Sequence, residues 1–181
     1  LKRPIFLGED TLRALGVPVH IEIDEVIEVR QGAAVLLGWK LDPHGLVASV
    51  HLRCGAAISP PLESTEIKVE RKDIKEAFAP TYGLIDSTAG FVAFGDTGGA
   101  VGGLCFLEIR LADGRIAFKP LPRPTRSGLA AIRRILADVS VAPNDVRRAF
   151  GTVLGPPIVA LNRRRLAQAP ALDEVAFGVP S

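Results

Sequence analysis

One carboxylate of this 181-residue chain stands in a pattern that suggests hydrolysis, Asp96 in Asp96-Thr97-Gly98. In aspartic-type hydrolysis two such carboxylates share a proton and activate a water molecule. The chain has one copy, with Gly95 and Gly99 where an apolar residue and a small residue such as Ser or Ala are expected. We therefore interpret it as a glycine-rich loop between strands. A hydrolase that uses Asp96 is kept only as a distant alternative.

The other motifs for catalysis or cofactor binding are not matched. Gly98-Gly99 and Gly102-Gly103 lack the spacing of a phosphate loop, no Lys follows them, and a strand is expected next. No GxSxG element occurs, and no Ser, His and Asp are arranged as a nucleophile with its base. We expect no catalytic residues, no enzymatic activity and no cofactor.

The soft metal ligands are His20, His44, His51, Cys54 and Cys105, and none stands in a CxxC or HxxxH arrangement. No metal site is expected. His44 is interpreted as a turn residue and His51 as a solvated strand residue. Each cysteine falls on the apolar face of a predicted strand, which favours buried free thiols. A disulfide between neighbouring sheets is the alternative.

Arginines are the polar residues with the clearest pattern, and seven of them follow the predicted C-terminal helices. A basic surface of this kind binds phosphates by releasing their counterions, or is simply solvated. Aromatic residues for base stacking are scarce, so nucleic-acid binding is not favoured. The predicted interaction surface consists of Arg133, Arg134, Arg147, Arg148, Arg163, Arg164 and Arg165.

Aromatic side chains that stack on sugar rings are the basis of a second function, carbohydrate binding. Strand parity places Trp39 with Val35, Leu37 and Leu41, which favours core packing for Trp39. Tyr82 is expected in a loop after Pro80 and is freer. The candidate ligand contacts are Tyr82, His51 and Arg53.

Period-two alternation marks the strands that must position these residues. The stretch Gly32–Cys54 is predicted to be one hairpin that turns at Asp42-Pro43-His44-Gly45. Val19–Val29 alternates with a phase shift at Asp24-Glu25, which indicates a bulge or tight turn. Further strands are predicted at 65–70, 90–94 and 103–111, with a hairpin at Asp113-Gly114 returning over 115–119. A short helix is expected over 71–78, before Pro80. The fold class is mainly β, an antiparallel β-sandwich.

The C-terminal third changes period from strand to helix. Pro120 to Pro124 is rich in proline and is predicted to be a linker. Ser127 is the expected N-cap of a first amphipathic helix, which carries Leu136 on its apolar stripe. A second helix should place Val146, Ala149, Phe150, Val153 and Leu154 on one stripe until Gly151 to Pro157 ends it, and a third is expected over 159–168. These stripes must pack on the sandwich or on a neighbouring domain.

The charge balance changes at the same place. Residues 1–119 contain 13 basic and 16 acidic residues, whereas residues 120–181 contain 9 basic and 4 acidic residues. The predicted organisation is an N-terminal arm (1–18), a β-sandwich (19–119), a linker (120–126) and a helical extension (127–181). Apolar runs are too short to span a membrane, and no secretion signal opens the chain. We expect a cytoplasmic, bacterial protein. A first residue Leu and the absence of Met suggest a piece of a longer protein.

Four local patterns occur together in this sequence. They are Gly38-Trp39-x-Leu41-Asp42-Pro43 with Gly45, Arg71-x-Asp73-Ile74-x-x-x-Phe78, Gly90-Phe91-Val92, and Leu154-Gly155-Pro156 with Leu161-Asn162 and Arg165-Leu166. Together they resemble the β-rich accessory region beside family 2 glycosyltransferases in large bacterial proteins of surface-polysaccharide assembly. The resemblance covers most of residues 25–170 and implies a non-catalytic module that positions, regulates or joins a glycosyltransferase. The diacid that such transferases use to hold a metal and a nucleotide sugar is absent from this sequence, so sugar transfer by this chain alone is not expected.

Overall fold

A computed structural model describes residues 8–83, 85–99, 103–124, 128–137, 139 and 143–168. The strands are β1 (His20–Arg30), β2 (Ala33–Leu41), β3 (Val47–Cys54), β4 (Ala57–Ile58), β5 (Glu66–Val69), β6 (Gly90–Asp96), β7 (Cys105–Leu111) and β8 (Ile116–Pro120). The helices are α1 (Thr11–Ala14), α2 (Lys72–Tyr82), α3 (Gly128–Ala137), α4 (Val146–Arg148) and α5 (Gly155–Gln168), with short 3-10 turns at Leu62–Thr65 and Pro143–Asp145 and a π-helical stretch at Ala149–Leu154.

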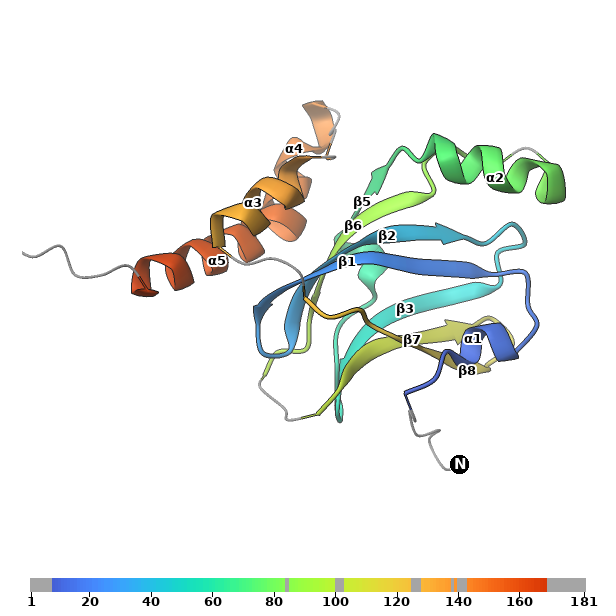
Figure 1. The fold of residues 1–181 in the computed structure, drawn as a ribbon, viewed down its shortest axis with the longest axis horizontal. Coiled ribbons are helices and arrows are strands. Elements are labelled where there is room, and N and C mark those ends of the chain that lie inside the picture. Colours follow the sequence, from blue (N-terminus) through green and yellow to red (C-terminus); the bar gives the residue numbers. More distant parts are fainter. Residues whose placement is uncertain are drawn as a thin grey trace, which may run out of the picture.

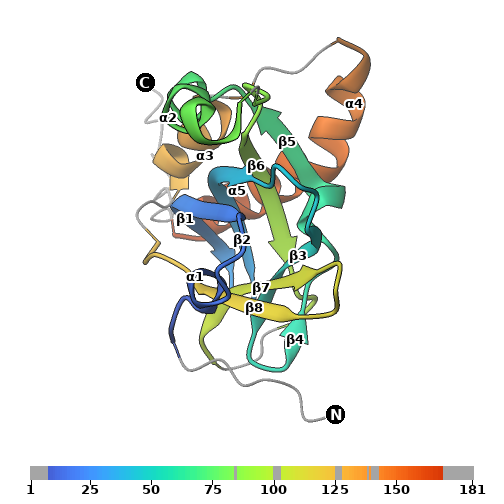
Figure 2. The same ribbon diagram turned by 90° about the vertical axis from the view of Figure 1, so that its right-hand side faces the viewer.

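The strands form two four-stranded antiparallel sheets (Figure 1). One has the order β1-β2-β6-β5 and the other the order β4-β3-β7-β8. In both ribbon views the two sheets lie one over the other, and α3 to α5 lie beyond the first sheet (Figure 2). The expected class, mainly β and antiparallel with C-terminal helices, is confirmed at this level.

The expectation that Gly32–Cys54 forms one hairpin is wrong. β2 pairs with β1 and β6, whereas β3 pairs with β4 and β7 in the other sheet. Between β2 and β3 the chain therefore crosses from the first sheet to the second. The Asp42 carboxylate stabilises this crossing, because it accepts hydrogen bonds at 2.8 Å from the backbone N–H groups of both Leu46 and Val47. Alternation reports which face a residue occupies and not which strand is its partner, so a crossing and a hairpin give the same pattern.

Other local predictions are confirmed. Asp113-Gly114 joins β7 to β8 as a hairpin, with a φ of 86° at Gly114 that favours glycine. The register of β1 against β2 shifts between Ile23 and Glu25, where a bulge was expected. Asp24 is the bulged residue, and its Oδ2 lies 2.7 Å from Arg71 Nη1. Arg71 Nη2 also lies 2.8 Å from Oδ2 of Asp73 in α2. These contacts tie the first turn of α2 to the first sheet.

The N-terminal residues from 8 onward contain one helical turn that lies on β8. Asp10 accepts hydrogen bonds from the N–H groups of Leu12 and Arg13 and so caps α1. Its other oxygen pairs with Lys119 Nζ at 2.8 Å. Thr11 Oγ1 accepts a hydrogen bond from the Phe118 N–H group at 2.8 Å. From residue 8 onward, the region predicted as an N-terminal arm therefore packs against the second sheet.

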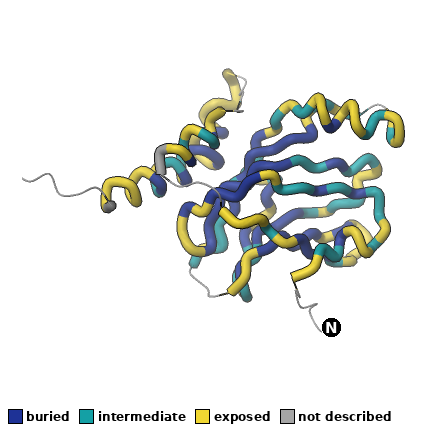
Figure 3. Tube along the Cα trace, in the orientation of Figure 1, coloured by how far each residue is buried: buried dark blue, intermediate teal, exposed yellow. Residues whose placement is uncertain are grey.

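Two apolar clusters make up the core. The first draws residues from both sheets, with Leu36, Phe91, Leu52, Leu107 and Ile109 among its members. The second lies on the outer face of the first sheet, where the C-terminal helices cover it (Figure 3). Its buried members are Ile27, Val29, Val35, Leu37, Ile67, Val92, Ala131, Ile135, Ala149, Val153, Leu154 and Leu161. The helical extension thus packs on its own chain.

The helical residues 143–168 form one continuous segment, so the expected break at Gly151 to Pro157 is wrong. The chain passes from α4 through the π-helical stretch into α5. The Gly155 N–H group donates to the Phe150 carbonyl, five residues back, and a Cβ on Gly155 would clash with that same oxygen. The wider turn precedes Pro156 and Pro157, which cannot donate and whose rings clash with carbonyls four residues back in an α-helix. Ser127, the expected N-cap, lies outside the described residues.

Candidate functional site

The predicted basic surface lies on α3, α4 and α5, with one exception. The Arg134 side chain turns toward the first sheet and its Nε lies 2.9 Å from Glu25 Oε2. Arg134 was expected on the outer surface, but it belongs to the contact between helix and sheet. The six others are exposed and form no ion pair with any residue that the structure describes: Arg133, Arg147, Arg148, Arg163, Arg164 and Arg165.

Large apolar side chains are exposed on the same helices. Six such side chains are exposed in the described part of the chain, and five of them lie on the C-terminal helices, one on α3 and four between residues 143 and 168. Val159 and Leu166 are two turns apart and share a face, whereas Leu161 points the other way and is fully buried. The five are Leu136, Val146, Phe150, Val159 and Leu166. Together with the six exposed arginines they are named the helical surface.

Three of these five residues were expected on the buried stripes. Phe150 is 49% exposed, and Leu136 and Val146 are also exposed. The buried positions of the second stripe are taken by Ala149, Val153 and Leu154, as expected. A 3.6-residue period does not describe the π-helical stretch Ala149–Leu154, which contains Phe150. This reason applies to Phe150 and not to Leu136 or Val146, which precede the stretch.

Tyr82 is the last residue of α2 rather than a loop residue, because the helix continues through Pro80. Its hydroxyl lies 3.1 Å from His20 Nε2. Phe78 stacks against Tyr82 and lies 5.6 Å from Trp39 between ring centroids. Core packing was expected for Trp39, but its side chain is half-buried beside Phe78 of α2 and belongs to neither core cluster. His20, Trp39, Phe78 and Tyr82 are named the aromatic cluster.

Tyr82 also lines a cavity of about 330 Å³ beside the aromatic cluster. The cavity combines one aromatic ring with charged and hydroxyl side chains from one end of the first sheet, where β2 and β5 end and β6 begins. Its polar lining residues are Lys40, Asp42, Lys68, Asp86 and Thr88. An aromatic face with several hydrogen-bonding groups around it is an arrangement that suits a sugar ring.

His51 and Arg53, the other candidate ligand contacts, are engaged in structural interactions. His51 is buried, with Nδ1 at 2.9 Å from the Ser59 carbonyl oxygen and Nε2 at 2.9 Å from Ser49 Oγ. The expectation that His51 is solvated is wrong, because the segment after β4 folds back over β3. Arg53 Nη1 lies 2.6 Å from Glu108 Oε2, and the Glu108 side chain is 4% exposed.

Asp96 is held by a guanidinium and not by a second carboxyl group within the described residues. Arg30 Nη2 lies 2.6 Å from both of its carboxylate oxygens. Asp96 also accepts from the Gly98 N–H group at 2.8 Å, and Thr97 Oγ1 donates to the Gly32 carbonyl at 3.0 Å. These contacts close a loop over the end of β1, which agrees with the loop interpretation.

The two cysteines form a disulfide, so the expectation of free thiols is wrong. The alternative also differs in detail, because the bond joins β3 and β7 within one sheet rather than two sheets. Cys54 and Cys105 stand opposite each other in the antiparallel register, with Cα atoms 4.1 Å apart. Parity placed them on one face, but the register that brings them together spans 51 residues of sequence and leaves no local signal.

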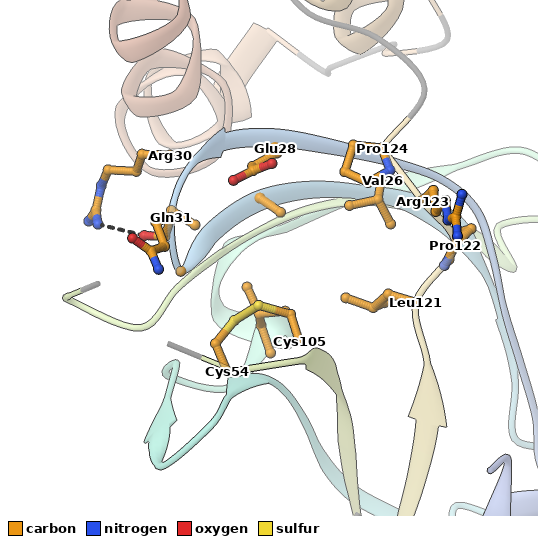
Figure 4. Close-up of a pocket in the computed structure, with 15 residues that line it drawn as sticks. Val26, Glu28, Arg30, Gln31, Cys54, Cys105, Leu121, Pro122, Arg123 and Pro124 are labelled. Carbon is orange, nitrogen blue, oxygen red and sulfur yellow. Dashed lines mark hydrogen bonds between the residues drawn. A yellow bond between two sulfur atoms is a disulfide. The ribbon is translucent and has the colours of Figure 1, made fainter. Parts of the chain in front are cut away.

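A cavity of about 540 Å³ opens against this disulfide, where ends of both sheets approach each other (Figure 4). Its apolar side includes Val26, Leu52 and Leu121. Its charged lining side chains are Glu28, Arg30 and Arg123. No metal site accompanies it, since no three His, Cys, Asp or Glu side chains gather in the described ranges in a way that would hold an ion. The structure also has, among its described helices, none with the length and hydropathy to cross a membrane.

No family model, curated protein or solved structure matches this chain. Several residues of the patterns quoted above have structural roles here. A Cβ at Gly38 would clash with the Glu22 carbonyl oxygen, and one at Gly90 would lie 2.7 Å from Arg71 Cγ and 2.8 Å from the Val69 carbonyl oxygen. These two glycines are therefore required by the close approach of neighbouring backbone and side-chain atoms.

Proposed function

We propose that this chain is a non-catalytic interaction module and that its partner binds the helical surface. The observation that carries the proposal is that five exposed large apolar side chains and six exposed arginines lie on the C-terminal helices over residues 128–137 and 143–168. Exposed apolar groups among charged residues mark protein interaction sites, and arginine is enriched in such interfaces. The inner face of the segment is already packed on the first sheet, so its outer face is the one available.

The proposed partner is a glycosyltransferase or another carbohydrate-active enzyme of bacterial surface-polysaccharide assembly, adjoining in the same protein or separate. This choice is supported by the four sequence patterns and by the positive charge of the segment, which suits an acidic surface on the partner. The proposed location is the cytoplasm. We also propose that the two sheets pack as one β-sandwich, which the apolar cluster shared by both sheets supports.

The test uses binding to the glycosyltransferase encoded with or beside this chain, measured by calorimetry. Phe150→Asp and Val159→Asp should each weaken binding at least about tenfold, since a charge replaces an apolar contact. Leu104→Asp is the matched control, because Leu104 is exposed but lies outside the helices. Absence of binding by the unmodified chain, or equal loss in the control, contradicts the proposal. Binding instead to anionic vesicles, with the same sensitivity to both variants, would assign the surface to a membrane.

A second candidate is carbohydrate binding at the Tyr82 cavity, favoured by its one aromatic ring among charged side chains. A glycan array of acidic and neutral bacterial sugars tests it. Tyr82→Ala should abolish any binding found, whereas Tyr82→Phe should retain the stacking face and most of the affinity. If the unmodified chain binds no glycan on the array, this candidate is ruled out. Hydrolysis at Asp96 is not proposed, because Arg30 occupies that carboxylate.

A further inference from the structure

We propose that the Cys54–Cys105 disulfide and the cavity against it form a thiol–disulfide exchange site for a small amino-acid or peptide thiol, with Cys105 Sγ as the sulfur attacked. The site lies away from the helical surface, and the inference does not rest on the proposed function. It takes its support from the position of the disulfide in the sheet, the unequal exposure of its two cysteine residues, and the charges that line the cavity.

The disulfide closes the end of a strand pair that backbone hydrogen bonds already hold. β3 and β7 pair from Val47 opposite Leu111 to Cys54 opposite Cys105. Cys54 is the last residue of β3 and Cys105 the first of β7. Cleavage of the sulfur–sulfur bond therefore loosens one end of the ladder and leaves its remaining register in place. A bond in this position can open and close while the sheet stays folded.

Access to the two residues is unequal. Cys54 is 0% exposed and belongs to the core cluster shared by both sheets. Cys105 is exposed. Exchange requires a thiolate to reach one sulfur, and its rate depends on which sulfur is accessible. Attack is therefore directed to Cys105, with Cys54 as the leaving sulfur.

The cavity volume of about 540 Å³ is in the range of small-molecule sites. Three charged side chains line it, and Arg30 among them is already paired with Asp96. Arg123 and Glu28 form no ion pair with the residues that the structure describes. A thiol that carries both a carboxylate and an ammonium group complements these two charges.

The reaction proceeds in two exchanges. The thiolate of the small molecule forms a bond to Cys105 Sγ while the Cys54–Cys105 bond breaks, and the electron pair stays on Cys54 Sγ, which takes up a proton. A second thiol then attacks the sulfur of the small molecule in the mixed disulfide and releases Cys105 as a thiol. Two small thiols are oxidised to one disulfide and the protein disulfide is reduced to two thiols.

The test follows cleavage of the disulfide in the folded full chain, by acid quench, alkylation and mass spectrometry. Glutathione, which carries carboxylates and an ammonium group, is compared with neutral 2-mercaptoethanol at equal thiolate concentration. Glutathione should react about fivefold faster, the effect expected for one exposed charge contact. Arg123→Gln should remove this preference, and Arg115→Gln, an exposed arginine on the β7–β8 hairpin, should keep it.

The direction of attack is tested with oxidised glutathione and single-cysteine variants. Cys54→Ser should form a mixed disulfide at Cys105, whereas Cys105→Ser should leave Cys54 unmodified in the folded state. A disulfide that is cleaved only in denaturant, or equal rates for both thiols, overturns the proposal. Because those two measurements use the unmodified protein, the proposal stays falsifiable even if a cysteine variant fails to fold.

Discussion

Arg134 of α3 reaches Glu25 of β1, with Nε 2.9 Å from Oε2, and joins α3 to the first sheet. The two side chains are 25% and 10% exposed, so the pair is largely withdrawn from water. Removing one partner of such an ion pair lowers the stability of the protein more than removing one partner of a surface pair. The reason is that the remaining charge stays in a poorly solvated position.

Arg134→Gln should therefore lower the free energy of unfolding by about 1–3 kcal/mol. The measurement is urea unfolding followed by circular dichroism. Arg133→Gln, the exposed neighbour on the same helix, should change stability by less than about 0.5 kcal/mol. Equal effects of the two variants would show that the contact with Glu25 does not hold the helices on the sheet.

Phe78→Ala should disturb the aromatic cluster in a way that fluorescence reports. Trp39 is the only tryptophan of the chain, and Phe78 lies over it with ring centroids 5.6 Å apart. Removal of the ring should expose Trp39, shift its emission to longer wavelength and cost about 2–3 kcal/mol, less than for a fully buried phenylalanine. Glu76→Ala, at an exposed position of α2, should leave the emission unchanged. An unshifted spectrum in Phe78→Ala would contradict the packing of α2 described here.

Acid should weaken the contact between α1 and β8. Burial acts to raise the pKa of Asp10, but Lys119 and the N–H groups of Leu12 and Arg13 outweigh it and lower that pKa below 3.8. A carboxyl group with a lowered folded-state pKa contributes stability above its unfolded-state pKa and loses it as the pH falls through the folded-state pKa.

Unfolding free energy measured from neutral pH to below 3.8 should therefore fall less steeply in Asp10→Asn than in the unmodified chain. Asparagine still caps a helix, so the variant keeps α1 while it loses the titrating group. Other carboxyl groups with lowered pKa values, such as Asp73 and Asp113, keep titrating in both proteins, so the difference between the two curves isolates Asp10. Identical curves would show that Lys119 does not stabilise the carboxylate.

Substitution by alanine at two glycines of the helical segment should change the stability of the protein in opposite directions. Gly151 has open space around its missing Cβ, so Gly151→Ala should stabilise by up to about 1 kcal/mol through helix propensity. Gly155→Ala should destabilise, because the new Cβ clashes with the Phe150 carbonyl oxygen. Thermal unfolding of both variants checks the prediction. A gain of stability in Gly155→Ala would mean that the segment is an ordinary α-helix there.

Local patterns predicted those features whose causes are local. The hairpin between β7 and β8 follows from Asp113-Gly114, because only a tight turn separates the two strands. The bulge in β1 follows from a phase shift within one strand. The crossing at Asp42 was missed because the carboxylate that holds it resembles any turn aspartate in the sequence.

The candidate site was predictable only in part for the same reason. Arginines on helices are visible as a pattern, but the inward turn of Arg134 depends on Glu25, more than a hundred residues away. The exposure of Phe150 depends on a π-helical stretch that no 3.6-residue period describes. The meeting of Cys54 with Cys105 depends on the register of two strands in a sheet whose other members are β4 and β8.

The crossing at Asp42 also governs how the chain can be divided. Each sheet takes strands from both halves of the sequence, and β6 lies between β2 and β5, which precede it in the chain. A cut after Gly83 would leave β1, β2 and β5 without the strand that joins β2 to β5, and β3 and β4 without β7. Neither fragment holds a complete sheet, so the two should regain the fold only when mixed.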